Sequence, residues 1–270
     1  MGGRKVQFTL NNVCVYNFEN AIHGMRNPLN SWKNSDSEFG ITSIKEFEEK
    51  VKNFVQKIVD AEPDKERKEI KEEYFTSFYN SEGKINIDGD YLTYALIGLK
   101  DLELAGKLIN GGTEHRKFLR QIFVSMDITA PLFWWKEMST YKVGTVANST
   151  STMHTITKEG ITPKLFSFDP APHGDVIKMR EDILKQCESL RVKYLETKDK
   201  MYWKSLIELL PSSFVQTRTW TANYEVLRTI AHQRQNHKLR EWERFISYLR
   251  YLPYSTNFIL GDIDNANKTN

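Results

Sequence analysis

Apolar side chains recur at every second position in some stretches of this chain and at every third or fourth position in others. The two-residue period covers residues 6–15, with an Asn-Asn interruption, and predicts a short strand or hairpin there. It returns between Ile122 and Ile128, where Val124 and Met126 belong to the buried set of a half-buried strand. Strands are therefore expected at the start of the chain and near its centre.

Helical periodicity dominates the rest of the sequence. Ser43 followed by Glu46 forms a capping box, and apolar residues at spacings of three and four then predict a helix. Pro131 suits the opening of another helix, because its missing N–H needs no intrahelical partner there. The spacing predicts helices over residues 18–25, 44–59, 91–109 with a break near Asp101, 132–142, 176–198 and from 223 onward.

Loops and a charged stretch separate these helices. Asn27-Pro28 and Gly111-Gly112 predict helix ends, while residues 30–38 form a polar loop and residues 81–90 are turn-like. Residues 62–76 carry many charges and few apolar anchors, which is typical of a solvated helical face. We expect one domain over residues 1–260 and a flexible tail over residues 261–270.

The composition narrows the class of protein. Of the 270 residues, 40% are hydrophobic and 27% are charged, which excludes a disordered chain. The net charge of +3 is too small for a protein that coats nucleic acid, so no nucleic-acid partner is expected. No apolar run suffices for a membrane span or a signal peptide, so we expect a cytoplasmic protein without a membrane partner. Cys14 and Cys187 are too few for a disulfide framework, and no metal site is expected.

The standard motifs of nucleotide and zinc chemistry are missing from the sequence. It contains no Gly-rich phosphate loop, no dinucleotide-binding glycine fingerprint, no paired-cysteine site and no His-Glu-x-x-His helix. It also lacks the glycine-flanked serine of a nucleophile elbow. Any chemistry must come from other polar clusters.

A basic cluster lies between Arg218 and Arg250, where seven Arg and Lys residues stand against three Glu residues. Arginine presents a planar fork that suits phosphate oxygens, so a face with Arg218, Arg234 and Arg244 could hold a nucleotide monophosphate or a cofactor pyrophosphate. The alternative is that these arginines solvate and pair along a surface helix.

A cluster of hydroxyl groups occupies residues 144–154, with the sequence GTVANSTSTMH. Small residues and hydroxyls let a ligand approach the backbone and supply both donors and acceptors, although an ordinary polar loop has the same composition. His115 could be an acid, a base, a ligand or a structural histidine. Trp134 and Trp135 suit packing in the core or in an interface, or stacking on an aromatic ring.

Taken in order over residues 91–250, these segments resemble the flavin-dependent thymidylate synthases. That family has a Gly-His-Glu-Thr or Gly-His-x-Ser element, a strand, a helix that opens near proline, and a signature of Arg-His-Arg, seven residues and Ser. The segment from Leu104 to Thr152 fits this frame without a gap, with His115 on the family's histidine and Pro131 on its proline.

The signature is altered in this chain. Thr140-Tyr141-Lys142 occupies the place of Arg-His-Arg, Thr150 stands at the serine, and Thr152 replaces the next arginine. A one-residue insertion would instead bring Asn148 and Ser151 onto the family's Asn and Ser, so both registers stay open. The later segment LPSSFVQTRTWTANYEVLRTIAHQRQNHKLREWERF is similar to a second family block, in which Arg218, Asn223, Arg234 and Trp242 keep their places.

The resemblance implies an α/β (α+β) fold with a mixed sheet flanked by helices, assembled as a homotetramer with active sites where subunits meet. It implies reductive methylation of dUMP to dTMP with FAD, NADPH and methylenetetrahydrofolate. It also implies site residues: substrate contacts from Lys142, Thr150, Ser151, Thr152, Arg218 and Arg244, with Thr150 in the catalytic position, and flavin contacts from His115, Thr140, Tyr141, Lys142, Asn223 and Arg234.

Two other hypotheses remain open. The altered signature is compatible with a catalytically silent, oligomeric nucleotide-binding or interaction module. A related enzyme could also modify a different pyrimidine with the same flavin and folate logic.

Overall fold

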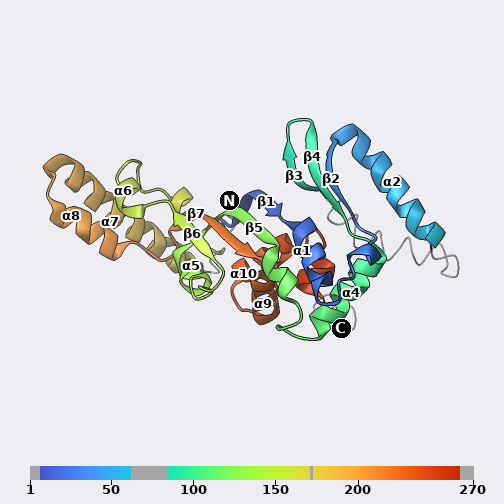
Figure 1. The fold of residues 1–270 in the computed structure, drawn as a ribbon. Coiled ribbons are helices and arrows are strands. Elements are labelled where there is room, and N and C mark those ends of the chain that lie inside the picture. The colour runs from blue at the N-terminus through green and yellow to red at the C-terminus, as the bar shows by residue number, and fades with distance from the viewer. Residues whose placement is uncertain (1–6, 62–83, 171–172, 262–270) are drawn as a thin grey trace. The chain divides into compact units, whose positions relative to one another are not determined.

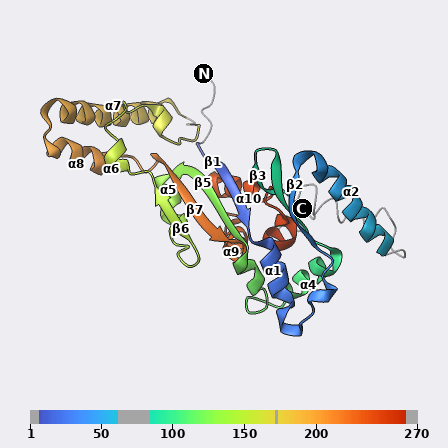
Figure 2. The ribbon, with the colours of Figure 1, turned by 45° about the horizontal axis from the view of Figure 1, so that its top comes forward.

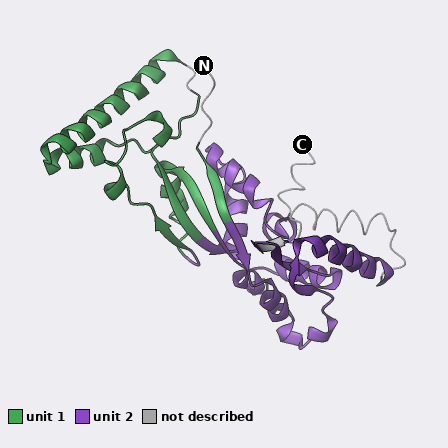
Figure 3. Cartoon of the chain, turned by 90° about the horizontal axis from the view of Figure 1, so that it is seen from above, with its two compact units in different colours: residues 1–12, 126–142, 146–220 green, residues 13–125, 143–145, 221–270 purple. Residues whose placement is uncertain are grey.

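The computed structural model describes residues 7–61, 84–170 and 173–261. Figure 3 shows the two compact units into which the chain divides: residues 1–12, 126–142 and 146–220 form unit 1, and residues 13–125, 143–145 and 221–270 form unit 2. The charged run at 62–76, the first apolar position at Val6 and most of the expected tail lie outside the described residues. Gly261 is described and lies in a turn.

The larger sheet has four strands, labelled in Figure 1: β1 (Thr9–Tyr16), β5 (Phe123–Pro131), β6 (Val146–Ser149) and β7 (Val215–Asn223). Their order in the sheet is β1-β5-β7-β6. The predictions of an N-terminal strand and of a strand over residues 122–128 are confirmed. Asn12, in the predicted interruption, has a left-handed φ of 50° but lies within the continuous strand β1.

Strand β5 has one apolar and one polar set of side chains, as the two-residue period requires. Val124, Met126, Ile128 and Ala130 are fully buried. On the alternate positions, Thr129 shares a 2.7 Å hydrogen bond with Thr217, and Asp127 accepts bonds of 2.6 Å from both Thr219 and Asn12. The bonds from Thr219 and Asn12 lower the pKa of Asp127. The polar side chains of neighbouring strands therefore satisfy one another's hydrogen-bonding groups.

Unit 1 contains the helices α5 (Leu132–Met138), α6 (Thr152–Thr155), α7 (Gly174–Thr197) and α8 (Lys200–Leu209). Helices α7 and α8 run side by side in Figures 1 and 2. Helix α7 confirms the helix predicted over 176–198, whereas no helix was predicted over α8. Pro131 opens α5 as predicted, but the helix ends at Met138 instead of residue 142. The reason is a turn, in which Thr140 and Tyr141 donate backbone bonds to the carbonyls of Glu137 and Met138.

The first helix of unit 2 is α1 (Phe18–Arg26), and a 3-10 turn at Asn27–Leu29 and a second at Trp32–Asn34 follow it. The helix end predicted at Asn27-Pro28 is confirmed. Strand β2 (Glu38–Ser43) leads into α2 (Ile44–Ala61), where the Ser43 hydroxyl accepts from the Glu46 N–H at 3.3 Å. The predicted capping box therefore starts this helix, and the hydrogen bonds at its N-terminus lower the pKa of Glu46.

The smaller sheet corrects two predictions. Lys84–Asp88 forms β3 where a turn was predicted, and Tyr91–Leu96 forms β4 where a helix was predicted. The order is β2-β4-β3, with both pairs antiparallel, so the backbone of β4 finds partners on both sides. The buried residues that pack between α2 and this sheet are Phe47, Val51, Phe54, Ile58, Val59, Leu92, Tyr94 and Leu96. Tertiary pairing thus decides between two periods that this short apolar run fits equally.

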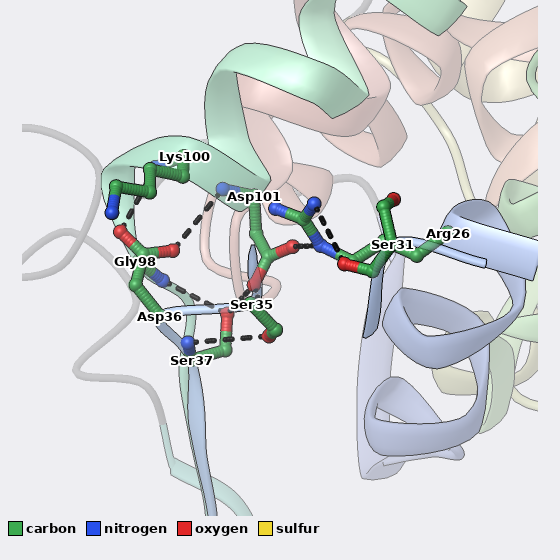
Figure 4. A network of polar contacts seen from close by, with 8 residues as sticks. All are labelled: Arg26, Ser31, Ser35, Asp36, Ser37, Gly98, Lys100 and Asp101. Carbon is green, nitrogen blue, oxygen red and sulfur yellow. Dashed lines mark hydrogen bonds and ion pairs between the residues drawn. The ribbon is translucent and has the colours of Figure 1, made fainter. Parts of the chain in front are cut away.

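Helix α4 (Leu99–Asn110) follows, and the break predicted near Asp101 is wrong because Asp101 lies within its first turn. Figure 4 shows why a carboxylate is buried there. Arg26 Nε donates to Asp101 Oδ1 at 2.6 Å, and Ser35 and Ser37 each donate to Oδ2 at 2.6 Å. Asp36 accepts from the backbone N–H groups of Lys100 and Asp101 and so covers the start of α4.

Gly111 and Gly112 end α4 as predicted, and a 3-10 turn at Lys117–Gln121 leads into β5. The helical region predicted from residue 223 is two helices, α9 (Tyr224–Arg234) and α10 (Arg240–Leu249), followed by a π-helical turn at Thr256–Leu260. Trp242, Phe245, Ile246 and Leu249 form the buried stripe of α10. Within the described residues, no helix is long and apolar enough to cross a membrane.

Candidate functional site

The first candidate group lies in unit 1 and is built on Arg218 of strand β7. The guanidinium carbon lies 4.3 Å from the ring centroid of Trp135, a buried residue of α5. Its Nε donates to Gln216 Oε1 at 2.9 Å, and its Nη1 donates to the Ser139 hydroxyl at 3.3 Å. Residues 216 and 218 share one face of the strand because the side-chain period of a strand is two.

The charge of Arg218 has no counterion in the described parts of the chain: its contacts there are a neutral amide, a hydroxyl and an aromatic face. Burial lowers the pKa of the Arg218 guanidinium, which nevertheless stays protonated at physiological pH. Cations that are partly desolvated are normally paired with anions. The remaining N–H groups of this guanidinium can therefore bind an anion, and a bidentate contact to a phosphate or carboxylate suits their geometry.

The stretch rich in hydroxyl groups approaches Arg218 through Gln216. Gln216 Nε2 donates to the Thr150 carbonyl at 2.6 Å and to the Thr152 hydroxyl at 3.4 Å. The Thr150 N–H and hydroxyl both donate to the Thr217 carbonyl, at 2.9 and 3.2 Å. Thr150, Thr152 and Arg218, three of the predicted site residues, thus all bond to the side chain of Gln216, which was not among the predicted residues.

The other unit 1 candidates flank this group along the chain. Ser151 is the N-cap of the four-residue helix α6, where its hydroxyl accepts from the His154 N–H at 3.4 Å. Thr140 lies in the turn after α5 and donates its hydroxyl to the Glu137 carbonyl at 2.7 Å. Tyr141 is half-buried and Lys142 is exposed in the same turn. Thr140, Tyr141 and Lys142 directly follow Ser139, which contacts Arg218.

The second candidate group lies in unit 2. Asn223 is buried and caps α9, because its Oδ1 accepts from the Val226 N–H at 3.0 Å. Gly144 has a φ of 74° and approaches the Asn223 amide so closely that a Cβ would lie 3.1 Å from Nδ2. The glycine in the 144–154 stretch is thus required by its contact with Asn223.

His115 is exposed, in the turn after α4. The adjacent Arg116 forms an ion pair with Glu225 of α9, with N–O distances from 2.8 to 3.1 Å, and this pair ties the turn to the helix. Arg234 lies over the Trp242 ring at 4.9 Å, and Arg244 is half-buried on α10. Unit 2 therefore carries four of the predicted site residues, which offer an imidazole, an amide and two guanidinium groups.

Sequence reasoning missed Gln216 and Ser139. Gln216 lies two positions before Arg218, a spacing that places both side chains on one face only if the segment is a strand. No strand was predicted over Val215–Asn223, so that signal was not usable. Trp135 was expected to pack in the core or stack on an aromatic ring, and it is buried beneath a guanidinium.

Comparison with solved structures identifies the fold. The crystal structure of thymidylate synthase X from Helicobacter pylori with FAD and dUMP is similar over 93% of this chain and 98% of that chain, with 15% identity and a TM-score of 0.57. The chain has the thymidylate synthase X fold. The expected α/β class, with sheets flanked by helices, is confirmed.

A structure of flavin-dependent thymidylate synthase ThyX from Helicobacter pylori complexed with FAD and dUMP is also similar. The match covers 61% of this chain and 84% of that chain, with 18% identity and a TM-score of 0.49. No protein-family model and no curated protein matches the sequence. The likeness to the thymidylate synthase X fold is therefore one of structure.

Proposed function

We propose that this chain is a flavin-dependent thymidylate synthase-like protein that converts dUMP to dTMP, with methylenetetrahydrofolate as carbon donor and NADPH as reductant. The observation that carries the proposal is the half-buried Arg218, which has neutral partners and no carboxylate within the described residues. A nucleotide phosphate would supply the counterion. The fold shared with an enzyme that holds FAD and dUMP supports the choice of nucleotide.

The residues of unit 1 have the chemistry of a nucleotide pocket. In this proposal Arg218 binds the phosphate or the pyrimidine, and the family resemblance implies the same role for Arg244. Lys142, Ser151 and Thr152 add an ammonium group and hydroxyls that can bond to the nucleotide. Thr150 takes the catalytic position, where a hydroxyl would stabilise charge that develops on the pyrimidine.

The donors of unit 2 fit a flavin. The exposed imidazole of His115, the Asn223 amide and the Arg234 guanidinium are donors of the kind that flavin carbonyls and a diphosphate accept. For Thr140, Tyr141 and Lys142, the assignment to the flavin comes from the family resemblance alone. The flavin, when bound, would supply the hydride, while the protein orients it and excludes water. We further propose a cytoplasmic homotetramer.

A catalytically silent nucleotide-binding module is the second candidate. It is favoured by Thr140 and Lys142, which stand at the family's two signature arginines: the Thr140 hydroxyl bonds within its own turn, and Lys142 offers a single compact charge. This candidate predicts dUMP binding without turnover.

The test is a pair of measurements on the purified full chain. The visible spectrum reports bound oxidised flavin, and the melting temperature is followed with added dUMP. A ligand at a hundred times its dissociation constant stabilises by about 2.7 kcal/mol, so dUMP should raise the melting temperature. Methylation of dUMP coupled to NADPH oxidation would then separate the enzyme from the silent module. A colourless protein that FAD and dUMP both fail to stabilise would end the proposal.

A further inference from the structure

The side chain of Gln216 joins the two parts of the unit 1 site. Its carboxamide oxygen faces Arg218 Nε at 2.9 Å, and its amide nitrogen faces the Thr150 carbonyl at 2.6 Å. The arginine nitrogen is only a donor and the carbonyl is only an acceptor, so this orientation of the amide is the one that satisfies both. The Gln216 carbonyl also accepts from Trp135 Nε1 at 2.9 Å, which fixes the backbone beneath the guanidinium.

The neutrality of this side chain matters for the charge of Arg218. A carboxylate at the same place would accept from Nε equally well, but it would neutralise the cation and face the Thr150 carbonyl with a second acceptor. An amide orients the guanidinium and leaves its positive charge available to an external anion. Ser139 and the Trp135 ring, the other contacts of Arg218 among the described residues, are uncharged as well.

We propose that Gln216 is a positioning residue: it holds Arg218 and the 150–152 backbone in register without neutralising the site, and so makes the site select a phosphorylated ligand over the corresponding nucleoside. The identity of the nucleotide rests on the proposed function, whereas the anion preference rests on the contacts of Gln216 and Arg218. The discriminating quantity is the ratio of the dissociation constants of deoxyuridine and dUMP.

The experiment is calorimetric titration of the full chain with dUMP, deoxyuridine and inorganic phosphate. Gln216→Glu keeps the shape and should reduce dUMP affinity about tenfold or more, the scale of a lost charge-assisted contact, while deoxyuridine affinity changes little. Gln216→Met removes all three side-chain hydrogen bonds but adds no charge, and its dUMP affinity should fall between those of the wild type and Gln216→Glu. Gln56→Glu makes the same charge change on an exposed position of α2 and should leave all three affinities unchanged.

A second variant tests whether Gln216 acts through Arg218. In an Arg218→Met background, Gln216→Glu should no longer change the ratio of the two dissociation constants. An equal loss of dUMP and deoxyuridine binding, or a full effect of Gln216→Glu without Arg218, would show a merely structural role and overturn the inference.

The phosphate titration separates this inference from the proposed function. If the wild type binds phosphate but not dUMP, and Gln216→Glu weakens phosphate binding, the positioning role stands and the thymidylate synthase proposal falls. If dUMP binds but its ratio to deoxyuridine is the same in Gln216→Glu, the positioning role falls alone. A wild type that binds none of the three ligands refutes both.

Discussion

The guanidinium of Arg218 lies over the ring of Trp135 at 4.3 Å, and its Nη1 donates a hydrogen bond to Ser139, which lies one helical turn after Trp135. An aromatic face attracts a cation but does not neutralise it. The pair therefore fixes the plane of the guanidinium and keeps its charge. This relationship, more than any sequence motif, makes unit 1 a candidate anion site.

Replacement of Arg218 by Met should abolish this anion preference. The variant keeps an apolar side chain over Trp135 but loses the charge, so dUMP affinity should fall by about tenfold or more. The matched control is Arg180→Met, because Arg180 also lies over an aromatic ring, that of Phe168, at 4.8 Å. Titration calorimetry should show the loss for Arg218→Met alone. Equal losses in both variants would contradict the assignment.

The buried pair of Arg26 and Asp101 should be a major determinant of stability. Asp101→Asn leaves the Arg26 charge buried without its carboxylate, and a broken pair of this kind costs about 3–5 kcal/mol in the free energy of unfolding. Glu103→Gln removes an exposed partner of Lys107 on the same helix and should cost about 0.5 kcal/mol or less. Urea unfolding of both variants measures the difference, and similar midpoints would refute the prediction.

Glu188 should make the stability of the protein depend on pH. Hydrogen bonds from Arg191 at 2.6 and 2.8 Å, with a further bond from the Ile161 N–H, lower the pKa of Glu188 in the folded state. A lowered pKa contributes stability above the pKa of the unfolded chain, and this contribution is lost as the pH falls through the folded-state pKa.

Glu188→Gln should therefore lower the free energy of unfolding at neutral pH by about 1 kcal/mol, and the difference from the wild type should shrink in acid. Glu208→Gln, at an exposed i,i+4 pair with Lys204, provides the control. Denaturant titrations at neutral and acidic pH give the comparison. A difference that does not change with pH would rule out the linkage.

Two glycines should respond in opposite ways to the same substitution. Gly144→Ala places a Cβ 3.1 Å from Asn223 Nδ2 at a φ of 74°, which should cost about 1–2 kcal/mol. Gly106 lies within α4, where an added Cβ would meet no heavy atom within 4 Å, so Gly106→Ala should stabilise by about 0.5–1 kcal/mol. Thermal unfolding reports both signs, and a neutral Gly144→Ala would show that the loop can shift.

Residues that cap or stop a helix correctly predicted where several helices begin or end. The Ser43–Glu46 capping box, the Asn27-Pro28 stop and the Gly111-Gly112 stop all lie where predicted, because each acts within one turn of the chain. The strand from Ile122 to Ile128 was also predictable, since one of its faces is completely buried.

The error at Tyr91–Leu96 has the opposite cause. Its apolar residues fit a helix and a strand, and the choice depends on the partners that β2 and β3 provide for its backbone. In the candidate site, too, some features could be predicted from the sequence and others depended on the tertiary structure. Hydroxyl and arginine clusters were visible along the chain, but Gln216 became a candidate only when β7 placed it beside Arg218 and Thr150.

The sequence by itself determined the helix ends at Asn27-Pro28 and Gly111-Gly112, the central strand, the missing standard motifs and the two polar clusters, because these depend on residue type and short-range spacing. Only the tertiary structure decided that Tyr91–Leu96 is a strand, that Asp101 is buried against Arg26, and that Arg218 is held by neutral partners. Each of these depends on which distant residue satisfies a hydrogen bond or a charge, and linear spacing does not carry that information.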